Sequence, residues 1–455
     1  MATDPSTLQT LADDVVDLVH RHGRGTDAEV EANVRVSRTR HGLTRFAESF
    51  IHQHVGEDTS AVHLTLAVDG RTSGATSTRL DRDSLGDLVA RTLASAARQP
   101  VDPAWPGATP PAEPAGPGRL DEATAAAEPG QRAEQVRRFV DTGGGDLRAA
   151  GYLDTEADWT AFASTAGQRV LGATSRATID GIHQTPTSAG SGHQTSVRLA
   201  DLDAEVVGQR AADLARRSAD ARDLEPGSFE VVLGPEAVAT LLTFLGFYGF
   251  NAKAHLEGAS FAELGAQQLD PAITLLDDPD DPRAVGLPFD AEGTPRTRTT
   301  LVEDGVIRAL AHDRRTAKRA GAVSTGGAIS GGEAFGAFPT NLRLPGGSTP
   351  AAELVGEVER GLLITQFNYV RVLEPKTLLS TGLTRNGTFL IEDGRIVAPI
   401  ANLRFTERFV HALSPGQVLS VGDDDRYADG EFGPGMVICP SLRLRSFAFT
   451  GGARG

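Results

Sequence analysis

The sequence is poor in several residue types, and each scarcity excludes a class of protein. Cys439 is the only cysteine among 455 residues, so the chain can form neither an internal disulfide nor a multi-cysteine zinc site. The longest apolar stretch, residues 237–250, is interrupted by threonine and glycine and is too short to span a membrane. These absences favour a reducing compartment. We therefore expect a cytoplasmic protein with no membrane partner.

Positive charge is also scarce. The chain has 44 lysines and arginines against 60 aspartates and glutamates, which gives a formal net charge of −16. Nucleic-acid binding needs clustered basic residues that neutralise phosphates, so we expect no nucleic-acid partner. The charge is compatible with neutral or cationic peptides, although solubility alone also explains it.

The length and a change in pattern predict two domains, 1–224 and 225–455. The first combines amphipathic helices with alternating strands, the helices at 7–21, 84–98, 132–141 and 203–221, and the strands at 34–38, 61–69, 160–163 and 168–174. Asp83 or Ser84 is expected to cap the second helix. Residues 99–130 are rich in proline, which predicts an extended, weakly packed surface excursion within the first domain.

The second domain is predicted to be β-rich, and two similar segments support this. Each has an apolar run, Glu-Asp-Gly and a second largely apolar run, around residues 303–305 and 392–394. Asp-Gly between such runs is a strong hairpin signal, because glycine accepts the positive φ that these turns need. We expect a β-hairpin at each segment.

Histidine spacing argues against a metal site in this chain. No two of the eleven histidines are four or five residues apart, and none directly precedes a glutamate. A zinc-hydrolase helix needs histidines at a fixed spacing and a carboxylate that activates the bound water. A site could still be assembled from distant residues, for example His255, Glu257 and Cys439. We expect no metal cofactor in the chain.

Two other clusters are interpreted as loops. Asp277–Asp281 holds four aspartates around a proline, lacks the spacing of a calcium loop and is expected to be solvated. Ser324–Gly332 is glycine-rich but lacks the ending of a phosphate-binding loop. No Gly-x-Ser-x-Gly elbow supports serine hydrolysis.

A strand, a Gly-Pro turn and a helix are predicted from Val231 onward. The helix, over residues 235–254, is apolar on most sides, which predicts burial in a core or an interface. The segment resembles the strand–turn–helix on which TldD-type metallopeptidases carry a His-Glu-x-x-x-His zinc motif. Further blocks are similar to the same family, at residues 37–53, 275–278, 289–295, 298–305, 324–326, 360–371, 381–387 and 402–405. Together they make the chain similar to a TldE/PmbA-type subunit, which lacks the motif.

The resemblance implies that the metal site is degenerate. It aligns Thr243 with the first histidine, Phe244 with the glutamate and Tyr248 with the second histidine, and none of these can do the original chemistry. Active members take a third ligand from a C-terminal cysteine segment, whereas the corresponding residues 423–435 contain no cysteine. The resemblance also implies an α+β fold, with an N-terminal α/β domain and a β-rich C-terminal domain of the TldD/PmbA type.

The function implied is that of a non-catalytic subunit in a TldD–TldE zinc metallopeptidase heterodimer. Such complexes degrade or trim unfolded peptides or peptide precursors, and the zinc is expected in the TldD-like paralogue. The candidate residues for lining an extended-peptide chamber are Asn368, Tyr369, Arg371 and Arg385, which punctuate strand-like runs, although each also suits a structural hydrogen bond. Two alternatives remain open: a self-sufficient peptidase-like enzyme with altered chemistry in a peptide-derived natural-product pathway, and a homodimeric peptide-binding scaffold.

Overall fold

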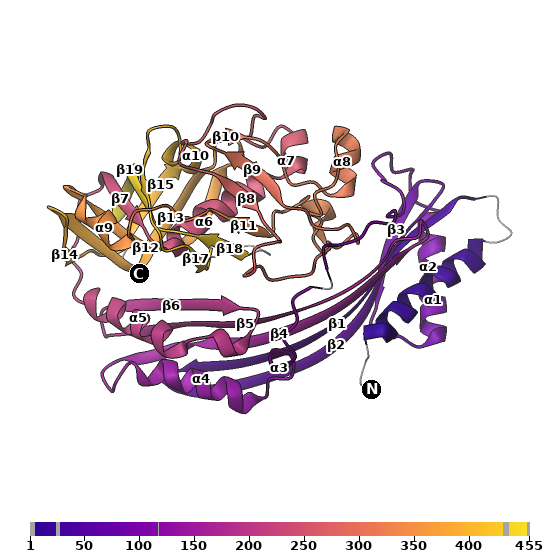
Figure 1. The fold of residues 1–455 in the computed structure, drawn as a ribbon, viewed down its shortest axis with the longest axis horizontal. Coiled ribbons are helices and arrows are strands. Elements are labelled where there is room, and N and C mark those ends of the chain that lie inside the picture. Colours follow the sequence, from indigo (N-terminus) through magenta and orange to yellow (C-terminus); the bar gives the residue numbers. More distant parts are fainter. Residues whose placement is uncertain (1–4, 24–27, 117, 431–435, 453–455) are drawn as a thin grey trace.

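The N-terminal half is built on one long antiparallel sheet. The structure is a computed structural model, described here for residues 5–23, 28–116, 118–430 and 436–452. Six strands pair in the order β3-β2-β1-β4-β5-β6. Their bounds are Val30–Ala47 (β1), Phe50–Val68 (β2), Arg71–Ser77 (β3), Arg148–Ser164 (β4), Arg169–Gln184 (β5) and Ala189–Ser196 (β6). Figure 1 shows this sheet as a curved layer, with the C-terminal domain above one end.

Helices cover one face of this sheet. At one end α1 (Pro5–Gly23) and α2 (Arg82–Ala96) bury Val15 and Leu88 against strand residues such as Leu64. At the other end lie α3 (Glu122–Ala125), α4 (Pro129–Asp141), the 3₁₀ turn η1 (Leu199–Asp201) and α5 (Ala204–Arg217). These bury Phe139 against Ile179. Successive strand residues point to opposite faces, so the intervening polar residues face the C-terminal domain.

The strands are much longer than the sequence predicts, and the cap of α2 differs. In β2 the segment from Phe50 to Ser60 is mostly exposed, so it has no apolar alternation to recognise; backbone pairing with β1 holds it in the sheet.

The cap of α2 is Asp81, whose side chain accepts a hydrogen bond from the Ser84 backbone N–H, so the prediction of Asp83 or Ser84 is wrong. The helix begins at Arg82, two residues before the start at residue 84 that the apolar periodicity indicates.

The C-terminal half contains two further sheets, as an α+β protein with a β-rich second domain should. One has the order β10-β9-β8-β11-β18-β17, formed by Val306–Ile307, Thr299–Glu303, Leu275–Asp277, Asn341–Arg343, Met436–Cys439 and Arg426–Ala428. The other has the order β12-β7-β19-β15-β13-β14, formed by Arg360–Glu374, Gly227–Leu233, Leu442–Gly452, Leu403–Arg408, Leu379–Glu392 and Arg395–Pro399, with β16 (Val418–Val421) on β19. Because β12 also pairs with β13, five of these strands close into a ring.

Short helices pack around these sheets. They are α6 (Pro235–Phe244), η2 (Leu245–Gly249), α7 (Ala252–Leu256), α8 (Arg314–Ala320), η3 (Gly332–Ala334), α9 (Ala351–Gly356), η4 (Pro375–Thr377) and α10 (Phe409–Ala412). Leu241 and Leu242 of α6 belong to the same buried core as Phe367 and Phe405 of the ring. Among the described helices, none is both long and apolar enough to cross a membrane.

Both predicted hairpins are confirmed. Strands β9 and β10 pair antiparallel around Asp304 and Gly305, and β13 and β14 pair around Asp393 and Gly394. All four turn residues have positive φ, from 47° to 80°, which is the backbone conformation that an Asp-Gly turn supplies.

The proline-rich segment is packed more firmly than predicted. Residues 99–116 and 118–121 form neither helix nor strand, but Trp105 is buried and its indole N–H donates to Glu31 Oε2 at 2.8 Å. The Arg314 guanidinium of α8 donates to the carbonyl oxygens of Pro106, Gly107 and Ala108 and to Thr109 Oγ1 at 2.7–3.3 Å. The segment therefore joins the N-terminal sheet to the C-terminal domain, and the prediction of weak packing is wrong. Residues 122–125 and 129–130 are helical as well.

The aspartate cluster is not a solvated loop either. Asp277, Asp278 and Asp281 are each at most 5% exposed. Asp281 binds Arg283 at 3.0 Å and Arg343 at 3.2 Å, and Asp277 Oδ1 accepts from the Asn341 backbone N–H at 2.9 Å. Arg283 is a near neighbour of Asp281, but Asn341 and Arg343 lie far from the cluster in the sequence, which is why the local pattern did not reveal the burial.

We expect Arg314→Ala to destabilise the contact between the proline-rich segment and α8. Three carbonyl oxygens lose their charged donor, which should lower the free energy of unfolding by about 2–4 kcal/mol. Limited proteolysis should also cut residues 99–121 faster. Arg319→Ala, at an exposed position of the same helix, is the matched control. Equal proteolysis of the two variants would contradict the role of Arg314.

Stability should depend on pH through Asp277. Burial raises the pKa of this carboxyl from 3.8 to about 6, against the opposing effects of Arg296 and the Asn341 N–H. A raised carboxyl pKa favours the folded state below pH 4, and this stabilisation is lost as the pH rises through about 6. The wild type should therefore lose stability as the pH rises from 4 to 8, whereas Asp277→Asn should not. The free energy of unfolding of the variant, measured by urea unfolding, should rise by about 1–3 kcal/mol relative to that of the wild type over this pH range. A pH-independent difference would be the contrary result; exposed Asp280→Asn controls for net charge.

Candidate functional site

The helix expected at residues 235–254 is not continuous. Strand β7 ends at Leu233, and α6 begins with Pro235 at its first turn, where the missing N–H costs nothing. After Phe244 the chain widens into the π-helical turn η2, and Asn251 then caps α7 by accepting from the Lys253 N–H. Asn251 also donates to the Phe335 carbonyl at 2.6 Å. Apolar content alone therefore overestimates the length of this helix.

The three positions aligned with the zinc motif are occupied by packing residues. Thr243 and Phe244 are 5% and 7% exposed. The Phe244 and Tyr248 rings stack, with centroids 6.1 Å apart and planes at 6°, and Phe409 meets Phe244 edge-on at 6.1 Å. A threonine hydroxyl and two aromatic rings provide no imidazole pair and no carboxylate, so they do not fit the zinc of the resemblance.

The segment expected to carry the third ligand runs beside this helix. A Cβ atom on Gly430 would lie 2.4 Å from Thr243 Oγ1 and 3.0 Å from the Ala239 carbonyl oxygen. Only glycine allows this close approach. Residues 431–435 of the segment lie outside the described residues. Cys439 is buried on β18, where its thiol donates to the Pro235 carbonyl and burial raises its pKa well above the ordinary value.

The cysteine, histidine and glutamate weighed as a dispersed site do not meet. His255 and Glu257 lie at the end of α7, and Glu257 is engaged by Lys253 at 2.8 Å. Within the described parts of the chain, the one group of three or more potential metal ligands is formed by other residues.

That group is Asp180, His193 and Asp429, whose ligand atoms all lie within 4.8 Å of one another. Asp180 of β5 and His193 of β6 are direct partners across the sheet, and His193 Nδ1 is 3.1 Å from Asp180 Oδ2. Burial lowers the pKa of His193, but the hydrogen bond and charge of Asp180, together with Asp429, raise it above the ordinary value. No local sequence pattern indicates this group, because its members become neighbours only through strand register and domain packing.

The group lies beside a cavity between the two domains. The cavity has a volume of about 550 Å³. On one side it is lined by β6 residues, including His193 and Thr195, and on the other by Arg426 and Tyr427 of β17. The Arg426 guanidinium binds both carboxylate oxygens of Glu236, at the start of α6, at 2.8 and 2.9 Å. β6 and β17 are each the last strand of their sheet, so the cavity separates two sheet edges.

The four proposed peptide-binding residues fall into two places. Asn368 and Arg385 line a larger groove of about 1820 Å³, which also takes in the end of β6 and the chain after α5. Tyr369 is 66% exposed, with a φ of 53°, and the Arg371 guanidinium lies 5.6 Å from its ring. The structure thus brings Asn368 and Arg385 to one groove and leaves the other two outside its lining. Their role in binding stays a prediction.

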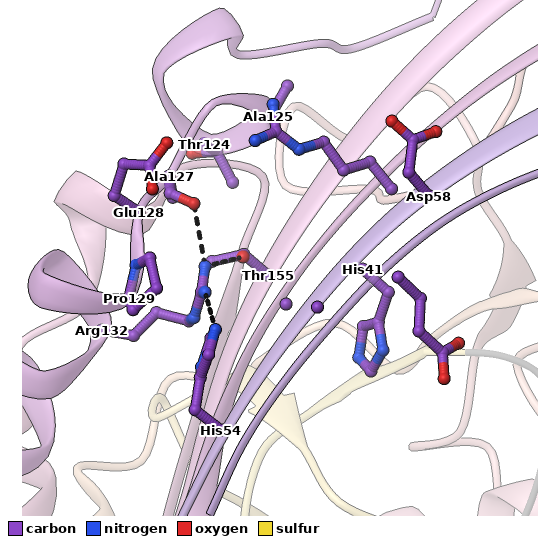
Figure 2. A pocket seen from close by; sticks show the side chains of 14 residues that line it. His41, His54, Asp58, Thr124, Ala125, Ala127, Glu128, Pro129, Arg132 and Thr155 are labelled. Carbon is purple, nitrogen blue, oxygen red and sulfur yellow. Dashed lines mark hydrogen bonds between the residues drawn. The ribbon is translucent and has the colours of Figure 1, made fainter.

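A third cavity lies on the helix-bearing face of the N-terminal sheet, with a volume of about 490 Å³ (Figure 2). Arg132 of α4 points into its wall and donates to the Ala127 carbonyl at 3.0 Å and to Thr155 Oγ1 at 2.9 Å. A Cβ on Gly42 would collide with this guanidinium, at 2.5 Å. Arg132 therefore holds α4 against the sheet. This structural role accounts for the buried guanidinium at the cavity without a ligand.

Comparisons with known proteins agree with the fold described above. Residues 226–451 match the family model described as the PmbA/TldA metallopeptidase C-terminal domain. A metalloprotease of Methanothermobacter thermautotrophicus is 28% identical over 262 residues, which cover 55% of this chain and 56% of that protein. A metalloprotease TldD homolog of Buchnera aphidicola is 25% identical over 260 residues, covering 53% and 52%. These alignments span about half the length of the curated relatives.

Solved structures extend the likeness to nearly the whole fold. TldE of Thermococcus kodakarensis superposes with a TM-score of 0.86 and 17% identity, covering 97% of this chain and all of that one. A Bacteroides thetaiotaomicron protein described as a modulator of DNA gyrase gives 0.82 and 20%, covering 99% of this chain and all of the other. At such identities the likeness shows the fold.

The fold and the matched domain define a metalloprotease-like α+β protein. The chain belongs to the TldD/PmbA family. The predicted family and fold class are confirmed, whereas the alignment of residues 243–248 with a zinc motif stays a prediction.

If Phe244 is a packing residue, truncation should affect stability strongly. Phe244→Ala should lower the free energy of unfolding by about 3–5 kcal/mol, because it opens a cavity in the core, and Phe244→Leu by much less. Urea unfolding measures both. Phe335→Ala, at a ring that is 59% exposed, is the control and should cost under about 1 kcal/mol. A Phe244→Ala protein as stable as the wild type would contradict the packing role.

Proposed function

We propose that this chain is the non-catalytic, TldE-like subunit of a TldD–TldE zinc metallopeptidase. One observation carries the proposal: Thr243, Phe244 and Tyr248 supply packing where the family resemblance expects two histidines and a glutamate. The zinc belongs to a TldD-like paralogue, where it activates a water molecule for hydrolysis. This chain contributes no metal ligand to that reaction and no general base.

The role of the chain in this complex is to hold an extended peptide. Two sheet edges, β6 and β17, flank the interdomain cavity. An exposed edge binds an extended peptide by adding it as a further strand, with main-chain hydrogen bonds for affinity and side-chain pockets for selectivity. The larger groove with Asn368 and Arg385 offers a second polar surface for the peptide. The substrates would be unfolded peptides or peptide precursors.

The cytoplasm is the compartment in which we place this activity. The single thiol, Cys439, is buried and forms no disulfide within the described chain. A fold that needs no disulfide is suited to a reducing compartment.

The test is peptide hydrolysis by the purified chain, by its motif-bearing paralogue and by their mixture. We expect no cleavage by the chain alone, a stable complex on gel filtration, and at least a tenfold higher rate in the mixture than with the paralogue alone. As a control, the paralogue's motif Glu→Gln variant should form the same complex without cleaving peptides.

Two results would refute the proposal. Cleavage by the chain alone would favour a self-sufficient enzyme with altered chemistry. A stable homodimer that binds peptides but does not pair with the paralogue would favour a scaffold.

A further inference from the structure

We propose that Asp180, His193 and Asp429 form a binding site for one divalent transition-metal ion, which joins the N-terminal sheet to the C-terminal domain. Asp180 and His193 come from β5 and β6, and Asp429 follows β17 in the other domain. The inference is independent of the proposed function, because it concerns residues outside the aligned zinc motif and is tested on this chain by itself.

The spacing of the ligand atoms suits an ion. Neighbouring ligands at about 2.1 Å from a metal are roughly 3.0 Å apart when they subtend a right angle, and opposite ones are about 4.2 Å apart. His193 Nδ1 and Asp180 Oδ2 are 3.1 Å apart. One atom from each of the three side chains lies within 4.8 Å of the others. Small side-chain rotations would thus complete the coordination.

The second ring nitrogen of His193 already has the partner that a metal-bound histidine needs. His193 Nε2 is 3.1 Å from Thr195 Oγ1, which in turn lies 2.9 Å from Thr178 Oγ1. When Nε2 carries the proton and donates a hydrogen bond to Thr195 Oγ1, Nδ1 is unprotonated and its lone pair points toward the two carboxylates. Metal-ligating histidines are oriented by such a second-shell hydrogen bond.

The charges favour a divalent cation. Two carboxylates and a neutral imidazole balance a charge of +2. The nearby Glu236 is held by Arg426 through both carboxylate oxygens, so it is committed elsewhere. A mixed set of imidazole and carboxylate donors suits Zn²⁺ or Mn²⁺, whereas Ca²⁺ and Mg²⁺ prefer oxygen ligands alone. The adjoining cavity, which His193 lines, gives the ion a path from solvent.

The test is metal binding by the full chain after removal of bound ions with a chelator. Equilibrium dialysis against Zn²⁺, and separately Mn²⁺, followed by elemental analysis should give one ion per chain, and the thermal midpoint should rise on addition of the ion. Asp429→Asn and His193→Gln should each weaken binding by about 100-fold or more, and Thr195→Val by about tenfold.

Asp201→Asn is the matched control, since Asp201 lines the same cavity but lies outside the ligand group. It should bind the ion as the wild type does. Asp429→Asn keeps the shape of the side chain, and its circular dichroism and metal-free thermal midpoint verify that it is folded. Unchanged stoichiometry and affinity in the folded Asp429→Asn protein, or binding of neither ion by the wild type, would overturn the proposal.

Discussion

The two-sided character of the N-terminal sheet determines how the rest of the molecule is built. In β4, Leu153 packs beneath the helices, and its neighbour Asp154 points to the opposite face. Helices α4 and α5 cover the apolar face of the sheet, so the C-terminal domain packs against the opposite face, whose side chains are mostly polar. Phe162 and Phe289 form a small apolar exception. The interface between the domains consequently consists largely of ion pairs, hydrogen bonds and cavities, so the proposed binding of a peptide or a metal ion there would not disturb a continuous core.

Helix α6, in contrast to the two-sided sheet, is apolar on most sides. It is enclosed by the closed ring of strands and by the sheet that contains β18, and nearly all its residues are buried. A metal site on such a helix needs every ligand to be paired with the ion, because unpaired polar groups in a core are costly. In this chain the aromatic side chains of Phe244 and Tyr248 lie in this region instead and contribute apolar burial. The stack of Phe244 on Tyr248 is consistent with a helix retained for stability.

Local chemistry explains which features could be predicted from the sequence. The two Asp-Gly hairpins follow from turn geometry, since Asp304 and Asp393 each precede a glycine that accepts positive φ. The buried aspartates could not be recognised, because Arg343, which binds Asp281, and Asn341, which binds Asp277, are distant in the chain. The same limit applies to Asp180 and His193: only the register of β5 against β6 makes them neighbours. Family resemblance anticipated the fold but gave no indication of this pair.

The charges around the interdomain cavity connect the two proposals. At one side of the cavity, Asp180 and Asp429 lie next to His193. The rest of the cavity lining includes Arg210, Arg283 and Arg426. Without an ion, the aspartates would attract the amino terminus or a basic side chain of a bound peptide. With a divalent ion in place, the acidic side would be neutralised. Metal and the basic end of a peptide would therefore compete for the same carboxylates, so that the ion would select which part of a peptide the cavity accepts.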